Sequence, residues 1–260
     1  MAEATLRFYA ELNRFLPPRR RQRDWALTFE PPAPARHLIE TCGVPHTEVE
    51  LILRTGESIG LDTPVGAGER LAVYPMFEAF DVRPLLRLRD APLRRPRFVA
   101  DAHLGALARR LRMLGFDTLW YNDIGDAALA RLAVEQQRIL LTRDRGLLMR
   151  REVTHGCHLP DADVDAQLGS LVRRLQLCAE IAPFTRCMGC NAPLEAVDAA
   201  EIRSLLPAAV YRRHQAFWRC PGCGRVYWKG SHWESMRRRV AARCPGASPG
   251  SEDGATGPAP

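Results

Sequence analysis

The sequence predicts an α/β protein composed of several small domains, and three observations support this fold class. Strand and helix patterns alternate between residues 97 and 160. Two Cys-x-x-Cys pairs, with 29 residues between them, lie in the last third of the chain. The first 75 residues show two strand patterns, a helix pattern and two further strand patterns. A chain of 260 residues has room for two or three domains, and we expect segments over 1–80, 81–96, 97–182, 183–244 and 245–260.

The first segment has the patterns of four strands and one helix. Residues 4–9 and 25–29 alternate between apolar and polar side chains, as half-buried strands do. A short helix is expected over 35–42, ending at Gly43, and further strands are expected over 48–54 and 70–74. This order of elements is typical of a β-grasp, ubiquitin-like module.

The run from Leu38 to Val49 resembles the small sulfur-carrier branch of the ubiquitin-like superfamily. Those carriers end in a free Gly-Gly whose carboxylate is activated. Here the module continues through Tyr74-Pro75-Met76-Phe77-Glu78 into the next segment. A thiocarboxylate role would therefore require cleavage, and we interpret the module as an appendage that binds a protein partner or guides the substrate.

Positive charge is concentrated in two stretches of the chain. The net charge is +7, and residues 81–99 hold 6 Arg against 2 acidic residues, while 183–244 hold 11 basic against 4 acidic residues. Clustered basic charge is typical of proteins that bind a phosphate backbone, so nucleic acid is an expected partner. The alternative is a codon effect, because 36 of the 37 basic residues are Arg.

The ends of the chain carry little structural signal. The N-terminus lacks the basic stretch and apolar run of a signal peptide, and no apolar run approaches the roughly 18 residues of a membrane helix. We therefore expect a cytoplasmic protein.

Two segments are not expected to belong to a domain. Residues 81–96 are expected to form a basic linker rich in Pro and Arg, and residues 245–260 are expected to form a disordered tail.

The central segment alternates strands with helices. Strands are expected over 97–100, 116–121 and 139–142, and helices over 104–115 and 127–136. Such alternation implies right-handed crossovers and a parallel sheet. Ligands of these sheets gather beyond the carboxyl ends of the strands.

Aspartates follow each of these three strands. Asp101 follows the first strand, Asp123 and Asp126 follow the second, and Asp144 follows the third. Carboxylates that lie close together repel one another unless cations neutralise them. Oxygen ligands favour Mg²⁺ or Mn²⁺, and such ions support phosphodiester hydrolysis.

Each aspartate also has a purely structural explanation. Asp101 could cap a helix that starts near Ala102, Asp126 could cap the helix that starts at Ala127, and Asp144 could lie in a turn. The residues alone leave both explanations open. Their occurrence at three strand ends, beside a cysteine module, favours catalysis.

The paired cysteines are Cys187 with Cys190 and Cys220 with Cys223. Four thiolates at this spacing are typical of a tetrahedral structural zinc, so we expect a zinc ribbon. The alternatives are two disulfides or buried thiols, and a reducing compartment disfavours disulfides. The unpaired cysteines are expected to be ordinary thiols, with Cys244 as a candidate for an additional role: Cys42, Cys157, Cys178 and Cys244.

Arginines and aromatic residues offer candidate contacts to nucleic acid. Arg109, Arg110 and Arg112 either reach phosphates or form a solvated helix face. Aromatic residues of the cysteine module are candidates for base stacking beside Arg237–Arg239, although we expect at least two of them to be core: Trp218, Tyr227, Trp228 and Trp233.

The stretch from Phe98 to Thr118, the run Arg138–Arg145 and the cysteine segment from Arg186 to Trp233 together resemble the PIN-like RNases of the Mut-seven C-terminal family. The resemblance covers roughly 97–240, and an N-terminal ubiquitin-like fusion is a familiar companion of that family. It implies a PIN-like nuclease domain, a divalent-metal site and RNA as the substrate class.

Carried over residue by residue, the resemblance places Asp101, Asp126 and Asp144 at the acidic motif positions and Thr142 at the hydroxyl beside the third. A fourth acid is expected, with Asp123 as the first choice and Asp161, Asp163 and Asp165 as alternatives. Candidate substrate contacts are residues that flank Asp144 or lie in the cysteine module: Thr142, Arg143, Arg145, Lys229 and His232.

The sequence therefore predicts a metal-dependent ribonuclease with a structural Zn²⁺ and a catalytic Mg²⁺ or Mn²⁺. RNA is the expected ligand, and the ubiquitin-like module offers a surface for a protein partner. Two other hypotheses remain, which are an RNA-binding adaptor without catalysis and a sulfur-transfer accessory protein.

Overall fold

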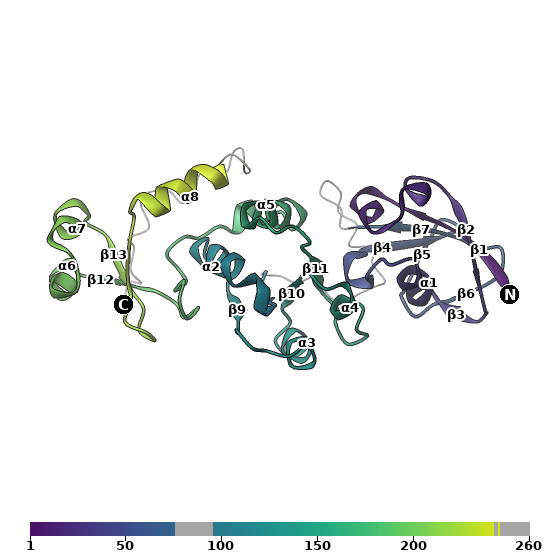
Figure 1. Ribbon diagram of the computed structural model, residues 1–260, viewed down its shortest axis with the longest axis horizontal. Coiled ribbons are helices and arrows are strands. Elements are labelled where there is room, and N and C mark those ends of the chain that lie inside the picture. The colour runs from purple at the N-terminus through teal and green to yellow at the C-terminus, as the bar shows by residue number, and fades with distance from the viewer. Residues whose placement is uncertain (76–95, 242–243, 245–260) are drawn as a thin grey trace, which may run out of the picture. The chain divides into compact units, whose positions relative to one another are not determined.

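The computed structural model describes residues 1–75, 96–241 and 244 (Figure 1). The expected linker, apart from Pro96, and the expected tail lie outside the described residues. The chain divides into two compact units, the first formed by Met1–Arg95 with Asp123–Pro160 and the second by Pro96–Asn122 with Asp161–Pro260. Each unit is described by itself.

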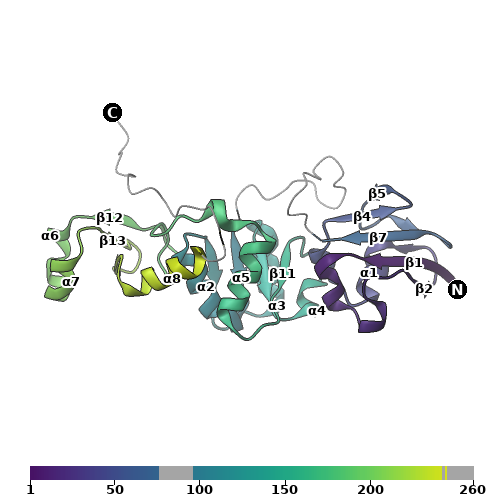
Figure 2. The same ribbon diagram turned by 90° about the horizontal axis from the view of Figure 1, so that it is seen from above.

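The N-terminal part of the first unit is a five-stranded sheet with the order β2-β1-β7-β4-β5. The strand β1 (Ala2–Phe8) pairs in parallel with β7 (Arg70–Tyr74) and antiparallel to β2 (Trp25–Phe29). Antiparallel pairs join β7 to β4 (Leu51–Arg54) and β4 to β5 (Glu57–Ile59). The helix α1 (Ala35–Thr41) packs against one face of the sheet (Figures 1 and 2). This is the β-grasp fold predicted from the sequence.

Short elements complete this ubiquitin-like domain. The strand expected over 48–54 begins at Leu51, because His46–Glu48 forms the 3-10 helix η3. Further elements that the sequence patterns did not predict are η1 (Ala10–Phe15), η2 (Pro18–Arg20), and the paired strands β3 (Ala33–Pro34) and β6 (Pro64–Val65).

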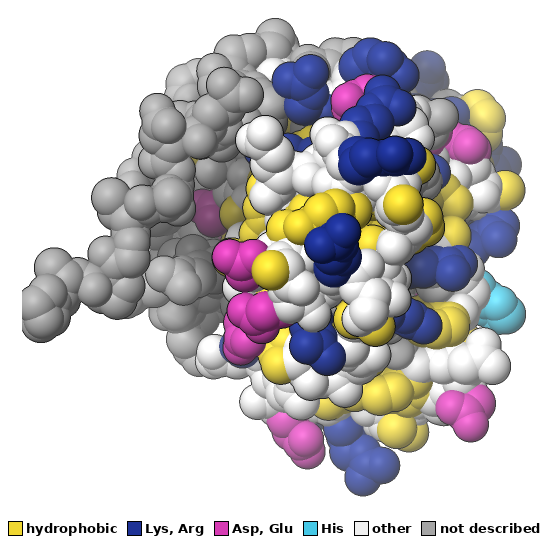
Figure 3. All heavy atoms as spheres, turned by 90° about the vertical axis from the view of Figure 1, so that its left-hand side faces the viewer, with side chains coloured by type: hydrophobic (Ala, Val, Ile, Leu, Met, Phe, Trp, Pro, Cys, Tyr) yellow, Lys and Arg dark blue, Asp and Glu magenta, His cyan; other side chains and the backbone are white. Residues whose placement is uncertain are grey.

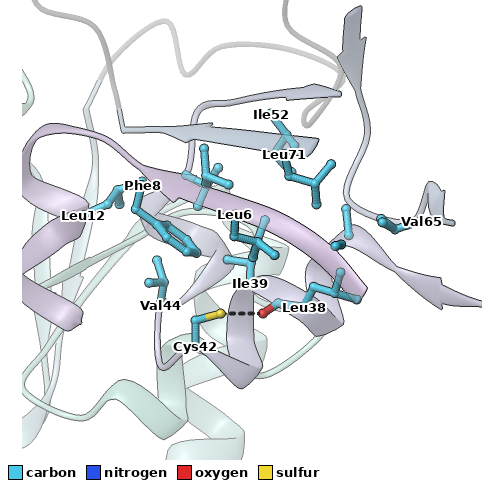
Figure 4. Packing of buried hydrophobic residues seen from close by; sticks show 14 of the residues in the cluster. Leu6, Phe8, Leu12, Leu38, Ile39, Cys42, Val44, Ile52, Val65 and Leu71 are labelled. Atoms are coloured by element: carbon cyan, nitrogen blue, oxygen red, sulfur yellow. Dashed lines mark hydrogen bonds between the residues drawn. The ribbon is translucent and has the colours of Figure 1, made fainter. Parts of the chain in front are cut away.

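The core of the ubiquitin-like domain lies between α1 and the sheet. Leu6 and Phe8 of β1 point toward Leu38 and Ile39 of α1, and all four are buried (Figure 4). Burying each such side chain stabilises the fold by about 1.5–3 kcal/mol. The thiol of Cys42 donates to the Leu38 carbonyl oxygen at 3.0 Å, and burial raises its pKa to about 12. Cys42 is thus an inert core thiol, as expected.

The first unit also holds two strands and two helices of the central segment. The strand β10 (Ile139–Thr142) pairs in parallel with β11 (Gly156–His158), which places Thr142 opposite His158. The helix α3 (Asp126–Glu135) buries Leu129, Ala130 and Ala133 and packs on β10. The short helix α4 (Arg145–Leu148) follows β10 directly.

The second unit contains the remaining elements of the central segment. The strand β8 (Phe98–Ala100) pairs in parallel with β9 (Thr118–Trp120). The helix α2 (Gly105–Met113) follows the 3-10 helix η5 (Ala102–Leu104) and packs against α5 (Val164–Arg174) and β9. The last element before the cysteine module is η6 (Leu177–Glu180). The parallel pairing and the strand–helix alternation make this a parallel-sheet α/β domain, as predicted.

Gly115 ends α2 for a conformational reason. Its φ is +96°, and a Cβ at this position would overlap the Ala182 carbonyl oxygen. A side chain at this position would therefore be strained by the left-handed backbone conformation and by the close approach of the Ala182 backbone. This confirms the helix end that the sequence predicts.

The cysteine module (183–244) has a three-stranded antiparallel sheet with the order β12-β13-β14. The strands are β12 (Glu195–Val197), β13 (Phe217–Arg219) and β14 (Val226–Trp228). Helical segments flank them, and these are α6 (Ala199–Ile202), η7 (Arg203–Leu205), α7 (Ala208–Arg213) and α8 (Ser231–Ala241).

One cysteine prediction is wrong. Cys178 and Cys244 form a disulfide, with their Cα atoms 5.6 Å apart, although both were expected to be ordinary thiols. A sequence separation of 66 residues carries no pairing signal, and only the fold brings Cys244 beside Cys178 of η6. Cys157 is a buried free thiol, as expected.

Within the described part of the chain, none of the helices is both long and apolar enough to cross a membrane.

Candidate functional site

Asp101 directly follows β8 and caps the next helical turn. Its carboxylate accepts a hydrogen bond from the His103 amide at 3.4 Å. The side chain is partly exposed. The structural explanation for Asp101 is therefore confirmed, and it does not exclude a second role for a carboxylate at the carboxyl end of a strand.

Asp144 directly follows β10 and caps α4. Its Oδ1 accepts from the Gly146 amide at 2.7 Å, and its own amide donates to the Thr142 hydroxyl at 3.0 Å. Thr142 is fully buried, whereas Asp144 is exposed. Thr142 thus holds the backbone of Asp144, and this contact is a structural reason for a hydroxyl side chain at that position.

Asp126 is the first residue of α3 and is exposed. The expectation that it caps a helix beginning at Ala127 is wrong, because the helix begins one residue earlier and Gly125 occupies the cap position. A carboxylate in the first turn is favoured by the helix dipole. Asp123 is exposed in the loop before this helix.

The alternative acids lie at the start of α5. Asp163 caps that helix by accepting from the Ala166 amide at 2.7 Å, and Asp165 lies in its first turn. The carbonyl oxygen of Asp161 accepts from the Gln167 side chain at 2.6 Å. Among the acids of the first unit that the structure describes, Asp123, Asp126 and Asp144 do not gather into a cluster comparable to that of the cysteines below.

The arginines beside Asp144 are exposed but make contacts. The Arg143 guanidinium donates to the Pro160 carbonyl oxygen at 3.5 Å, and the Arg143 carbonyl accepts from His158 Nε2 at 3.0 Å. The Arg145 guanidinium lies 5.2 Å above the centre of the Phe15 ring. Both cations remain accessible to an anionic ligand.

The four paired cysteines form one compact cluster. Their Sγ atoms all lie within 4.8 Å of one another, with 3.6 Å between Cys187 and Cys223 and 3.4 Å between Cys190 and Cys220. A tetrahedral zinc with Zn–S bonds of about 2.3 Å needs sulfur separations of about 3.8 Å. None of the four is in a disulfide, so the donor set fits zinc.

Two similar turns build this cluster. In each, the amide four residues after the first cysteine donates to that cysteine's carbonyl at 2.9 Å, from Asn191 to Cys187 and from Gly224 to Cys220. Both donors have positive φ, +68° for Asn191 and +73° for Gly224. Asn and Gly are the residues that adopt this conformation most readily, so the local sequence of each turn matches its backbone.

The electrostatics of the cluster also favour a cation. Burial raises the pKa of the Cys220 thiol to about 12. At Cys187, hydrogen bonds from the Tyr227 hydroxyl, 3.1 Å away, and from two backbone amides outweigh the effect of burial and lower the pKa to about 6. Zinc binds the deprotonated form of cysteine, so the hydrogen bonds to Cys187 favour a metal ligand at this position.

Arg112 joins the first cysteine turn to α2 and β9. It is 4% exposed, and its guanidinium donates to the carbonyls of Thr118 at 2.8 Å, Met188 at 3.2 Å and Gly189 at 2.9 Å. Neither a phosphate contact nor a solvated face, the two expectations for this residue, is correct. Arg112 shares a helix face with the buried Ala108 and Leu111, and this periodicity is the signal that would have revealed it.

Asn191 adds a second connection. Its side-chain oxygen accepts from the Thr118 amide at 2.9 Å, and its side-chain nitrogen donates to Asp117 at 2.7 Å. The amide of Thr118, at the start of β9, is thereby paired by the cysteine turn. The module is fastened to the α/β domain rather than tethered to it.

Comparisons with known proteins agree with this architecture. The Mut7-C RNAse domain model matches residues 96–240, which is more than half of the chain. The chain belongs to the Mut7-C RNAse domain family. The Mut7-C ubiquitin model matches residues 1–81, and none of the curated proteins matches.

Solved structures match the ubiquitin-like part of this Mut7-C chain. SAMP1 from Haloferax volcanii is 16% identical, with 30% of this chain and 100% of that chain covered and a TM-score of 0.25. A second structure, H. volcanii small archaeal modifier protein 1, is 18% identical, with coverage of 29% and 98% and a TM-score of 0.24.

The cysteine module of this Mut7-C chain exposes a basic face. Lys and Arg side chains gather there, with acidic side chains between them (Figure 3). The exposed basic residues of the module include Arg203, Arg212, Arg213, Arg219, Arg225 and Lys229. The side chain of His232 lies outside the described residues.

The aromatic residues of the module make two kinds of contact, and Trp233 takes part in both. Trp218 and Trp233 pack on Phe184, with ring centres at 4.3 Å and 5.2 Å, so these two are structural. Tyr227 and Trp228 line a cavity of about 340 Å³, together with Trp233. All four side chains are half-buried and none is buried, so the expectation that at least two of them belong to the core is not met.

Proposed function

We propose that this protein is a divalent-metal-dependent ribonuclease that hydrolyses phosphodiester bonds of RNA. Membership of the Mut7-C RNAse domain family supports nuclease activity. The observation that carries the finer proposal is Asp144, which is exposed at the carboxyl end of β10 while its backbone is held by the buried Thr142. A fixed backbone with an accessible carboxylate suits a metal ligand.

In this proposal Asp101, Asp126 and Asp144 are ligands of Mg²⁺ or Mn²⁺, with Asp123 as the fourth acid. Their carboxylate oxygens suit these hard cations. A bound divalent ion supplies a water of lowered pKa and stabilises the leaving oxygen. Arg143 and Arg145 hold the scissile phosphate by charge-assisted hydrogen bonds.

The four clustered cysteines bind a structural zinc in the same proposal. The ion joins the second cysteine turn to the first, which Arg112 and Asn191 connect to α2 and β9. Lys229, His232 and the exposed arginines of the module contact the phosphate backbone of RNA, which also makes binding sensitive to salt. The proposed location is the cytoplasm.

One observation favours an RNA-binding adaptor as the second candidate function. Asp101 and Asp144 both cap helical turns, and this structural role would explain both residues without catalysis. A sulfur-transfer accessory role is the third candidate, and it requires cleavage after the ubiquitin-like domain.

Cleavage of single-stranded RNA by the purified chain, with and without Mn²⁺, tests the proposal. The decisive variant is Asp144→Asn, and the matched control is Asp198→Asn, because Asp198 caps α6 through the same contact to the amide two residues later, at 2.8 Å. Asn caps about as well as Asp, so both variants should stay folded.

We expect metal-dependent cleavage by the unmodified chain, a loss of at least a hundredfold in Asp144→Asn and no loss in Asp198→Asn. RNA binding without cleavage by the unmodified chain would favour the adaptor. Equal activity of both variants would reduce Asp144 to a helix cap.

A further inference from the structure

The ubiquitin-like domain contacts the end of β11 through a buried carboxylate. The side chain of Glu48, in η3, is 0% exposed and pairs with Arg14 at 3.2 Å. It also accepts a hydrogen bond from the His158 amide, and Arg14 donates to the His158 carbonyl at 3.2 Å. Both backbone groups of His158 are thus bound by residues of the ubiquitin-like domain.

The side chain of His158 contacts the loop that contains Asp144. Its Nε2 donates to the carbonyl of Arg143, the residue directly before Asp144, at 3.0 Å. His158 is 5% exposed, and its ring centre lies 5.5 Å from that of Phe15. The backbone on one side of Asp144 is therefore fixed by a residue that the ubiquitin-like domain holds.

The residue on the other side of Asp144 meets the same domain directly. The Arg145 guanidinium lies 5.2 Å from the centre of the Phe15 ring, and the Arg14 guanidinium lies 4.8 Å from it. Phe15 is 6% exposed and belongs to the core cluster of the ubiquitin-like domain. A cation over an aromatic face is attracted by the ring quadrupole, so Arg145 is oriented from the N-terminal domain.

A second set of contacts extends over the segment that follows α4. His46 Nε2 donates to the Val153 carbonyl at 2.7 Å while its Nδ1 lies 2.6 Å from Glu40. Arg36 donates to the Arg151 carbonyl at 3.2 Å. The loop from β10 to β11 is thus held near both of its ends.

Burial of Glu48 makes this arrangement specific. A buried carboxylate that loses its partners is strongly unfavourable, and the partners of Glu48 include Arg14 and the amide of His158. A domain that served only as a tethered appendage would not need a buried charge whose hydrogen bond comes from a residue 110 positions away.

We propose that the ubiquitin-like domain is a positioning element for the Asp144 loop, acting through Glu48, Phe15 and His158. The inference rests on the proposed function for the role of Asp144. The domain orders the proposed metal ligand and the phosphate-binding Arg145, so its contribution does not depend on a Gly-Gly terminus. Glu48, Phe15 and His158 are positioning residues and do not contact the substrate.

Four variants of the full-length chain test this inference. His158→Ala removes the donor to Arg143, and His158→Gln restores one because a glutamine amide nitrogen can replace Nε2. Glu48→Gln removes the charge but keeps the shape. The control is Asp24→Asn, since Asp24 pairs with Arg70 and Arg7 on the exposed surface of the same domain.

The first measurement is hydrogen exchange of the amides between Arg143 and Met149, which does not depend on activity. Two of them report directly on the loop, since the Gly146 amide donates to Asp144 and the Met149 amide to Arg145. We expect exchange about tenfold faster in His158→Ala and Glu48→Gln. His158→Gln and Asp24→Asn should exchange like the unmodified chain.

The second measurement is Mn²⁺-dependent RNA cleavage, resolved into kcat and the metal concentration for half activity. A small misplacement of a reacting group costs on the order of a hundredfold in rate. We expect His158→Ala to lower kcat tenfold to hundredfold and to raise the Mn²⁺ concentration needed for half activity. Both quantities should recover in His158→Gln. Thermal melting identifies any variant that has lost its fold.

Unchanged exchange between Arg143 and Met149 in a folded His158→Ala variant would overturn the inference. So would a loss of activity in His158→Ala that His158→Gln fails to recover. If the unmodified chain does not cleave RNA, the proposed function fails, whereas the exchange data still decide whether the ubiquitin-like domain orders this loop.

Discussion

The ubiquitin-like domain and the cysteine module keep their strands together by different means. The first buries a continuous apolar cluster between α1 and the sheet, including Leu6, Phe8 and Ile39. Among the described residues of 183–244, the buried apolar side chains are Ile202 and Phe217, together with Cys187, Cys220 and Cys244. Three of these five buried side chains are cysteines.

This difference follows from size and composition. A small module cannot bury enough apolar area to offset its conformational entropy, and metals or disulfides replace the missing core. Here the cysteine cluster and the Cys178–Cys244 disulfide both close the same region. Removal of metal or reduction of the disulfide should therefore unfold the cysteine module and leave the ubiquitin-like domain folded.

The largest expected effect comes from removing one of the four cysteines that we propose as zinc ligands. Binding of a structural zinc contributes about 10–16 kcal/mol in small zinc-finger peptides. Cys220→Ser should therefore abolish zinc binding and the pairing of β12, β13 and β14, while the ubiquitin-like domain stays folded. Because Arg112 donates to the first cysteine turn, amides of α2 and β9 should also lose protection.

Elemental analysis and hydrogen exchange check this prediction, with Cys157→Ala as the control. Cys157 is buried in β11, outside the cluster, so its variant should retain zinc. An absence of zinc from freshly purified, unchelated protein would contradict the zinc assignment. Retained strand pairing in Cys220→Ser would show that the module has a sufficient core of its own.

The disulfide should have the next largest effect. It closes a sequence separation of 66 residues that contains all four clustered cysteines. Loss of such a crosslink typically costs about 2–4 kcal/mol, so Cys178→Ser should destabilise the cysteine module. Urea unfolding of this variant should coincide with that of the reduced, unmodified protein, and zinc content should be unchanged.

A matched control sharpens this second test. Cys42→Ala alters a buried thiol of the ubiquitin-like core and should leave the response to reductant as it is in the unmodified chain. If reductant has no effect on the unmodified protein, the disulfide does not contribute to its stability, and zinc alone accounts for the module.

The sequence was sufficient where the signal is local. Leu104, Leu107 and Leu111 recur at helical spacing, and Gly115 ends α2 as expected. The Cys-x-x-Cys spacing predicted the sulfur cluster, because each pair lies in one tight turn whose residue types suit its backbone. Periodicity and turn chemistry are properties of a few consecutive residues.

Contacts between distant residues were not predictable in this way. Glu48 and His158 are 110 positions apart. The residues next to them in the sequence form no pattern that predicts a buried hydrogen bond between the two. The sequence pattern placed Arg112 with Arg109 and Arg110 as a candidate phosphate contact or a solvated residue. Its carbonyl acceptors, Met188 and Gly189, are more than 70 positions away in the sequence, so its burial was not predicted. The boundary of α3 differed by one residue, which changed Asp126 from a cap into a first-turn residue.

The smallest expected effect concerns the exposed ion pairs of the ubiquitin-like domain. The hydrogen bond and charge of Arg70, followed by those of Arg7, lower the pKa of the Asp24 carboxyl below its ordinary value. Its side chain is 39% exposed, and exposed pairs typically contribute less than about 1 kcal/mol. Asp24→Asn should therefore reduce stability only slightly at pH 7.

The pH dependence of this effect follows from the direction of the shift. Because the carboxyl titrates at a lower pH in the folded than in the unfolded chain, its contribution is complete above the unfolded pKa of about 3.9. It is lost as the pH falls through the lower, folded value. Urea unfolding of Asp24→Asn and of the unmodified chain should differ at pH 7, less so at high salt, and the difference should shrink as the pH falls below about 3.9. A difference that does not shrink at acidic pH would mean that Asp24 acts through shape or backbone contacts rather than through its charge.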